Sequence, residues 1–236
     1  MNNEQLMKLD GLVYLREITS GNFENVSEFI EYITTDENGN VNPEGKINET
    51  KIRIAERDYQ ISTLEAAGKF EEADKIRKEY SGDNVVNFEV KAINNGAMQK
   101  TVDMIRDDDE LLNLKVSYTS GEYQQELMEN GADKYCTDGL TAACFEDSNG
   151  NAYVIYRGTD GYIAWLENTE AATLADTEYQ QKALNFFESI PKLTMYNDVQ
   201  LSGHSKGGNM VQYITVVSKY SEYISKALSY LSLIHI

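Results

Sequence analysis

The segment from Val199 to Tyr213 constrains the fold of this chain more than any other. It reads Val-Gln-Leu-Ser-Gly-His-Ser-Lys-Gly-Gly-Asn-Met-Val-Gln-Tyr: a short apolar run, a tight turn around Ser205, and a run of helical character. A serine at a sharp turn between a strand and a helix has its hydroxyl lifted above the edge of a sheet, where a substrate can reach it. The segment therefore predicts an α/β fold in which Ser205 is a candidate nucleophile.

Glycines stand two residues before and two residues after this serine, at Gly203 and Gly207. We expect them to support the turn, because a side chain at either position would collide with the backbone of the neighbouring strand or helix. The amino end of the following helix favours negative charge, as an oxyanion requires. The alternative is an ordinary glycine-rich turn with a solvated serine.

Composition excludes several classes of function. The chain has 236 residues and a net charge of -18, from 21 basic and 39 acidic side chains. Phosphate backbones and anionic lipid surfaces repel such a chain, so we expect no nucleic-acid partner. No window approaches the ~20 apolar residues that span a bilayer, and Met1–Gln5 lacks the features of a secretion signal. We expect a cytoplasmic protein without stable membrane insertion.

The few cysteines and histidines argue against a metal centre. Cys136 and Cys144 are the only cysteines, and without an export signal we expect both to be reduced. His204 and His235 are the only histidines, so a histidine-rich zinc site is excluded. The acidic run Asp107–Glu110 could bind a hard cation, but a solvated helix end explains it more simply. We expect no metal and no cofactor.

The first half of the chain reads as helical. Apolar residues from Val26 to Ile33 recur at helical spacing, with Asn25 or Ser27 as the cap. Residues 46–80 are strongly charged and predict a helical hairpin inserted in the domain and broken near Gly68, with a solvated outer face. The functional alternative is a cap over an active site. Further helices are expected over 98–105 and 121–128. The stripe expected to be buried in the hairpin comprises Leu64, Ala67, Phe70, Ala73, Ile76 and Tyr80.

The signal for a sheet begins at Leu140. Thr141–Glu146 and Ala152–Tyr156 flank an Asn-Gly turn, which predicts a hairpin. A helix from Asp176 to Ser189, with Asp176 as its cap, then leads to the strand before Ser205. This order implies a parallel crossover. We expect a single domain over 1–236, with a mostly parallel sheet and helices on both faces.

A second motif gives the chain a specific resemblance. Arg157-Gly158-Thr159, then Trp165, and Gly-His-Ser-Lys-Gly-Gly downstream resemble the fungal-type (class 3) lipases within the α/β-hydrolases. The resemblance covers about residues 135–230 and is greatest to bacterial lipase-like hydrolases with Gly-His-Ser-Lys-Gly-Gly-Asn. It implies that Ser205 is the nucleophile and that Thr159 and the backbone N–H of Lys206 form the oxyanion hole. Arg157 and Trp165 would brace the oxyanion loop, although ordinary packing explains Trp165 equally well.

The rest of a catalytic triad is not visible. In this fold an acid and then a histidine follow the serine, but only Glu222 and His235 are available and both are poorly placed. The side chains of His204 and Lys206 adjoin the serine across a turn and point away from it. Residues 231–236, Leu-Ser-Leu-Ile-His-Ile, resemble a translated sequencing adapter. We expect native sequence to end near Tyr230 and the C-terminal strands to be missing.

These patterns favour a serine hydrolase that acts on a small acyl ester. Without an acid and a base in the chain, we expect this copy to be inactive and poorly soluble. The alternative is a non-catalytic, hydrolase-like binding module that uses its acidic helices as an interaction surface. A peptidase or a thioesterase on the same scaffold stays open, because a fold does not fix its substrate.

Overall fold

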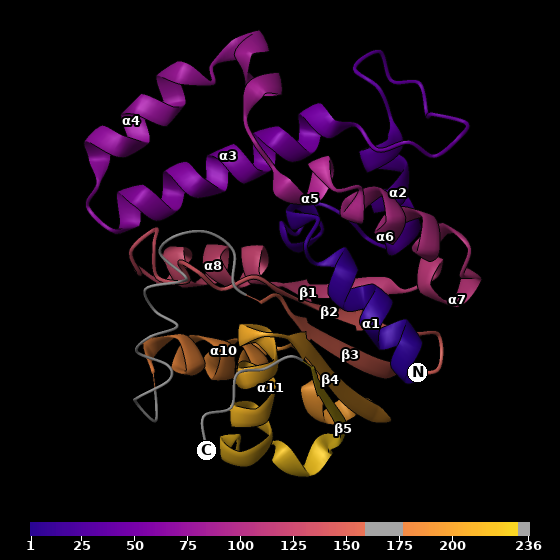
Figure 1. The fold of residues 1–236 in the computed structure, drawn as a ribbon. Coiled ribbons are helices and arrows are strands. Elements are labelled where there is room, and N and C mark those ends of the chain that lie inside the picture. The colour runs from indigo at the N-terminus through magenta and orange to yellow at the C-terminus, as the bar shows by residue number, and fades with distance from the viewer. Residues whose placement is uncertain (159–176, 231–236) are drawn as a thin grey trace.

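The computed structural model describes residues 1–158 and 177–230, in which five strands form one mixed sheet of order β1-β2-β3-β4-β5 (Figure 1). The strands are β1 (Lys115–Thr119), β2 (Ala142–Glu146), β3 (Asn151–Tyr156), β4 (Asp198–His204) and β5 (Ile224–Tyr230). The pairs β1–β2 and β2–β3 are antiparallel, whereas β3–β4 and β4–β5 are parallel. The chain is therefore α/β as expected, but its sheet is evenly mixed and not mostly parallel.

The antiparallel half contains one strand that the sequence did not predict. β1 has five residues between helical segments, and a register shift between Val116 and Tyr118 interrupts its pairing with β2. The expected hairpin is confirmed. Its turn is held by the Asp147 carboxylate, which accepts hydrogen bonds from the amides of Asn149 and Asn151, both at 2.9 Å.

The parallel half follows the predicted crossover. β3 is followed, after residues outside the description, by α10 (Glu178–Ser189) and then by β4. Thr177 caps α10 through the amide of Gln180, so the expected cap, Asp176, is replaced by its neighbour; Asp176 itself lies outside the described residues. After β4 comes α11 (Lys206–Val217), which leads to β5.

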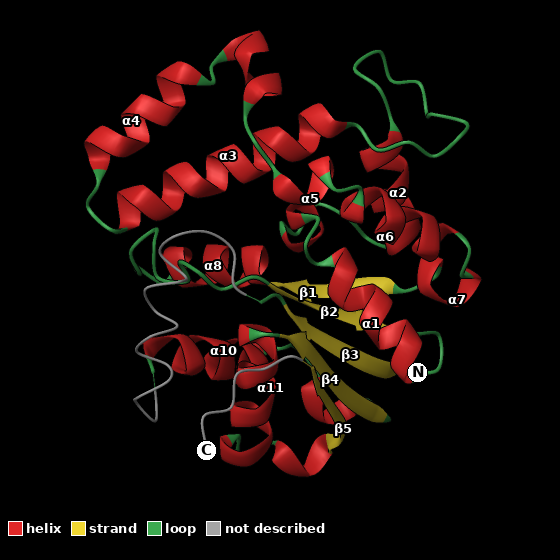
Figure 2. Cartoon of the chain, in the orientation of Figure 1, coloured by secondary structure: helices red, strands yellow, loops and turns green. Residues whose placement is uncertain are grey.

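Helices cover both faces of the sheet, as expected (Figure 2). Side chains alternate along each strand: Ala143, Phe145, Tyr153 and Ile155 pack with the N-terminal helices. These helices are α1 (Asn3–Leu12), α2 (Val26–Thr34) and α6 (Ala97–Arg106). The intervening strand residues pack with α8 (Ser120–Glu129), α10 and α11. Asn25 caps α2, and α6 and α8 are the helices expected over 98–105 and 121–128.

The predicted helical hairpin over 46–80 is confirmed and forms an outer layer (Figure 1). It consists of α3 (Glu49–Ala66) and α4 (Phe70–Glu79), and Gly68 between them has φ 72°. Its small core contains Ile61, Leu64 and Ala73. The expected stripe is wrong at Ala67, which is exposed, and at Phe70, which is 60% exposed, because the tip of the hairpin extends beyond the body of the protein.

Short elements complete the described chain: α5 (Lys91–Asn94), α7 (Asp109–Leu112) and the 3-10 helices Arg16–Thr19, Gly82–Asn87, Leu193–Met195 and Ser221–Tyr223. Asp108 caps α7 and pairs with Lys8 at 3.1 Å, so part of the acidic run has a structural role. Among the helices of 1–158 and 177–230, none combines the length and the apolarity needed to traverse a bilayer. Cys136 and Cys144 are not bonded to each other.

Candidate active site

Ser205 lies at the junction of β4 and α11 in a strained backbone conformation. Its φ is 55° and its ψ is -121°. A residue other than glycine held there costs on the order of 1–3 kcal/mol and persists only where its surroundings fix it. The Ser205 amide donates to the Tyr230 carbonyl of β5 at 2.9 Å, and the Ser205 hydroxyl makes no helix-capping hydrogen bond. Ser205 is half-buried at the apex of this turn.

Both flanking glycines are required by close backbone approaches. A Cβ at Gly203 would lie 2.4 Å from the carbonyl carbon of Gly207, where α11 begins. A Cβ at Gly207 would lie 2.2 Å from the carbonyl oxygen of Tyr156, at the end of β3. The turn is thus tight because helix, elbow strand and neighbouring strand touch through their main chains.

The segment that follows β3 passes directly beside this turn. The Arg157 amide donates to the Thr141 carbonyl at 2.9 Å. A Cβ on the next residue, Gly158, would lie 2.5 Å from the His204 carbonyl oxygen and 3.3 Å from Ser205 Cβ. The resemblance assigned oxyanion and bracing roles to Thr159 and Trp165, and both lie outside the described residues, as do residues 231–236.

Arg157 is buried and faces a carboxylate that the sequence did not single out. Both terminal nitrogens of Arg157 lie 3.2 Å from Glu56 Oε1, and Arg16 Nη2 lies 3.4 Å from Glu56 Oε2. Burial would raise the pKa of Glu56, but the charges and hydrogen bonds of the two arginines outweigh it and hold that pKa below its usual value. Glu56 belongs to α3, so the helical hairpin contacts the segment beside Ser205 directly.

The two side chains next to Ser205 are engaged elsewhere. His204 Nδ1 lies 3.3 Å from the Tyr14 hydroxyl, on the face covered by α1. The Lys206 ammonium lies 3.5 Å from the centroid of the Tyr179 ring on α10. Glu222 precedes β5, whose Ile224 pairs with Val199 at the start of β4. Glu222 therefore lies near the opposite end of β4 from Ser205, about 20 Å along the strand at ~3.3 Å per residue.

A buried carboxyl group lies behind the elbow strand. Ser202 donates to Asp10 Oδ2 at 2.6 Å, and the Tyr230 hydroxyl donates to the same oxygen. The other oxygen of Asp10 is buried, and it has no hydrogen-bond partner within the described residues. Burial raises the pKa of Asp10 to about 7, although both hydrogen bonds act in the opposite direction. This acid ties α1 to the two strands that hold Ser205.

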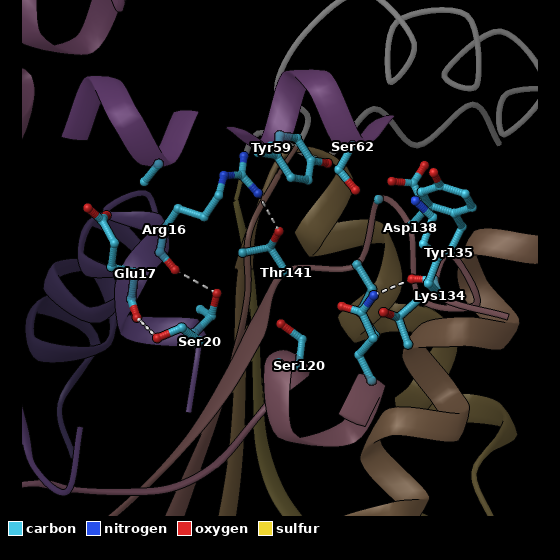
Figure 3. A pocket seen from close by; sticks show the side chains of 17 residues that line it. Arg16, Glu17, Ser20, Tyr59, Ser62, Ser120, Lys134, Tyr135, Asp138 and Thr141 are labelled. Carbon is cyan, nitrogen blue, oxygen red and sulfur yellow. Dashed lines mark hydrogen bonds between the residues drawn. The ribbon is translucent and has the colours of Figure 1, made fainter. Parts of the chain in front are cut away.

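A cavity of about 240 Å³ opens at the same edge of the sheet. Figure 3 shows Arg16 reaching toward Thr141 beneath the ring of Tyr59, with Ser120 and Tyr135 on other walls. Arg16 Nη1 donates to Thr141 Oγ1 at 2.9 Å. Because the Thr141 carbonyl also accepts the Arg157 amide, the wall of the cavity adjoins the segment beside Ser205. The residues that line the cavity include many with hydroxyl groups, but Ser205 is not among them.

Nothing in the described part of the chain forms a metal site, since no group of three or more His, Cys, Asp or Glu converges there. The carboxylate oxygens of Glu17 are buried, which raises its pKa to about 7, and this group lies within electrostatic range of Glu56, Arg16 and Arg157. The groups described at this edge of the sheet that could act on a ligand are the Ser205 hydroxyl, the main-chain amides beside it, and the guanidinium groups of Arg16 and Arg157.

A family model described as Mbeg1-like matches residues 117–229, just under half of the chain. The matched region begins within β1 and ends within β5, so it contains the elbow and its neighbouring strands. The helices over 3–112, including the hairpin, lie outside it. No curated protein and no solved structure matches the chain.

Proposed function

We propose that this chain has the α/β-hydrolase architecture of the fungal-type lipase-like group and carries the nucleophile of a serine hydrolase, Ser205, without a complete catalytic triad. The observation that carries the proposal is the backbone of Ser205, which is held at φ 55° between β4 and α11 while its hydroxyl is left out of the helix cap. Strain at a residue of this kind is typical of catalytic positions. The close main-chain contacts of Gly203 and Gly207 support the same interpretation.

In this proposal the reaction is acyl transfer. Ser205 Oγ attacks the ester carbonyl, its proton passes to a base, and the alcohol leaves with a proton to give an acyl-enzyme. Water then attacks the acyl carbon and releases the acid and the free serine. The developing oxyanion would accept hydrogen bonds from the Lys206 amide, in the first turn of α11, and from Thr159. Loss of one such donor typically costs ~3 kcal/mol of barrier.

The substrate in this proposal is a small, soluble acyl ester. The stretch between Thr159 and Ser205 is too short to supply the long apolar lid that a lipid substrate would need, which favours short acyl chains. Neither side chain next to Ser205 is assigned as the base in this proposal, because His204 faces Tyr14 and the Lys206 ammonium lies over Tyr179.

The second candidate function is a hydrolase-like binding module. It is favoured by the same two contacts, which engage the side chains of His204 and Lys206 with Tyr14 and Tyr179. An unassisted hydroxyl is a weak nucleophile at neutral pH.

Labelling with a fluorophosphonate probe tests the proposal. In the protein expressed from its natural gene, we expect the probe to attach to Ser205, as mapped by mass spectrometry, and labelling to be lost in Ser205→Ala but kept in Ser221→Ala. Labelling that is absent, or that survives Ser205→Ala, would favour the binding module. For residues 1–236 alone we expect no turnover of p-nitrophenyl butyrate above that of Ser205→Ala, and robust turnover there would contradict this expectation.

A further inference from the structure

One carboxylate, Glu56 on α3, lies between two guanidinium groups from other parts of the chain. It accepts hydrogen bonds from Arg157 at 3.2 Å and from Arg16 at 3.4 Å. The side chain of Arg157 is only 2% exposed, and those of Glu56 and Arg16 are 10% and 12% exposed. The three charges therefore meet almost out of contact with water, where unpaired charges are costly.

Arg157 transmits this contact to the main chain beside Ser205. Its amide is fixed on the Thr141 carbonyl, and the preceding residue, Tyr156, pairs with Gly203 of the elbow strand. The following residue, Gly158, contacts the His204 carbonyl and the Ser205 side chain so closely that no Cβ would fit. The position of the Arg157 side chain consequently restricts where the backbone at 158 can run.

We infer that Glu56 is a positioning residue for Ser205: from the helical hairpin it anchors Arg157 and thereby holds the Gly158 backbone against the elbow. The inference rests on the proposed function, since it assigns Glu56 to the loop that leads to the oxyanion donor. Arg16 links Glu56 to the wall of the cavity, because one of its terminal nitrogens binds Glu56 and the other donates to the Thr141 hydroxyl. The hairpin thus acts as a brace for the site and not as a detached surface element.

The physical reason is that a neutral side chain cannot replace the carboxylate. Glutamine at position 56 has the same shape but no negative charge, so the two hydrogen bonds that hold the Arg157 guanidinium on Glu56 would lose their charge assistance. Movement of that side chain would release the backbone at 157 and 158, while the strand pairing of β3 further from the elbow stays in place. If Glu56 only contributed to overall stability, its substitution would instead destabilise the whole domain evenly.

Hydrogen exchange of single amides, followed by NMR in residues 1–236, separates these two cases. In Glu56→Gln we expect the Arg157 amide, which is bonded to Thr141, to exchange at least tenfold faster relative to the Val154 amide in the middle of β3. Glu65→Gln is the matched control, because it removes a carboxylate of the same helix that pairs instead with Arg77 and Lys134. It should leave the exchange ratio unchanged.

Glu56→Asp keeps the charge on a shorter side chain and should give an intermediate acceleration at Arg157. If Glu56→Gln does not fold, the aspartate variant carries the test. Equal exchange at Arg157 and Val154 in the variant that folds, or an equal effect in Glu65→Gln, would overturn the inference.

A second measurement keeps this inference apart from the proposed function. In the protein from its natural gene, Glu56→Gln should lower the rate of fluorophosphonate labelling at Ser205 by at least tenfold, and Glu65→Gln should not. If the parent protein is not labelled at all, the proposed function fails whatever the exchange data show. If the parent is labelled and Glu56→Gln reacts at the same rate, the positioning role fails and the hydrolase survives.

Discussion

Asp10 is a buried acid, and its protonation is coupled to the stability of the fold. It is 4% exposed, and the hydroxyl groups of Ser202 and Tyr230 both donate to one of its oxygens. Its pKa of about 7 lies above the unfolded value of 3.8, because burial penalises the charged form. The folded protein therefore binds this proton more tightly than the unfolded chain, and the stabilisation, which is complete below about pH 3.8, is lost as the pH rises toward 7.

Replacement by the neutral isostere tests this linkage. We expect the free energy of unfolding of Asp10→Asn to improve relative to the parent as the pH is raised from 5 to 7, by up to ~1 kcal/mol per pH unit. Urea titrations at several pH values measure the difference. Val216→Ala, an exposed substitution that changes no titratable group, is the control and should show no such trend. A constant difference between Asp10→Asn and the parent would contradict the pKa shift.

Neither Asp10 nor Glu56 could be identified from the sequence. Asp10 meets Ser202 across 192 residues, and Glu56 meets Arg157 across 101. Each carboxylate stands in a helix where charged residues normally face water. Ser205 could be identified because its signal is local: two glycines and a strand–turn–helix pattern lie within a few residues of it.

Local signals also decided which elements could be predicted. The hairpin of β2 and β3, the elbow and α2 depend on turn and cap residues within their own segments, and all three were predicted. β1 was missed because its five residues become a strand only by pairing with β2, which begins 23 residues after β1 ends. Its antiparallel pairing is also the reason why the sheet is evenly mixed.

The crossing of α11 over β3 depends on the absence of a side chain at Gly207. A methyl group there would lie 2.2 Å from the Tyr156 carbonyl oxygen, and neither main chain can move without breaking sheet pairing. We expect Gly207→Ala to cost at least ~2 kcal/mol of unfolding free energy, at the high end of overpacking effects. Urea denaturation followed by circular dichroism measures the loss.

Val216→Ala provides the comparison on the same helix. Val216 is 82% exposed, so its substitution should change the free energy of unfolding by less than ~0.5 kcal/mol. Comparable losses in the two variants would mean that the backbone contact at Gly207 is not what fixes α11.

At the scale of the whole molecule, the dominant electrostatic fact is a net charge of -18. Repulsion between unpaired surface carboxylates opposes the compact state, and 0.1 M salt screens it over about 10 Å. The buried pair of Glu56 and Arg157 is screened much less. We therefore expect the melting temperature to rise by several degrees between 10 mM and 300 mM NaCl at pH 8.

Near pH 4.5, the isoelectric point of the sequence, the melting temperature should depend little on salt, because the net charge is then close to zero. Potassium chloride should reproduce the sodium result, which excludes binding of a particular cation. A melting temperature that falls with salt at pH 8 would show that exposed ion pairs outweigh the repulsion.

The pairing of Asp10 with Ser202 also sets an order for folding during synthesis. Ribosomes add ~5–20 residues per second, so α1 waits roughly 10–40 s for the partner that lies 192 residues downstream. Leu6, Leu9 and Leu12, all fully buried in the finished protein, share their core with residues of α6 and β3, which are made before β4. The buried hydrogen bond between Asp10 and Ser202 is therefore one of the last contacts that α1 can make while the chain is being synthesised.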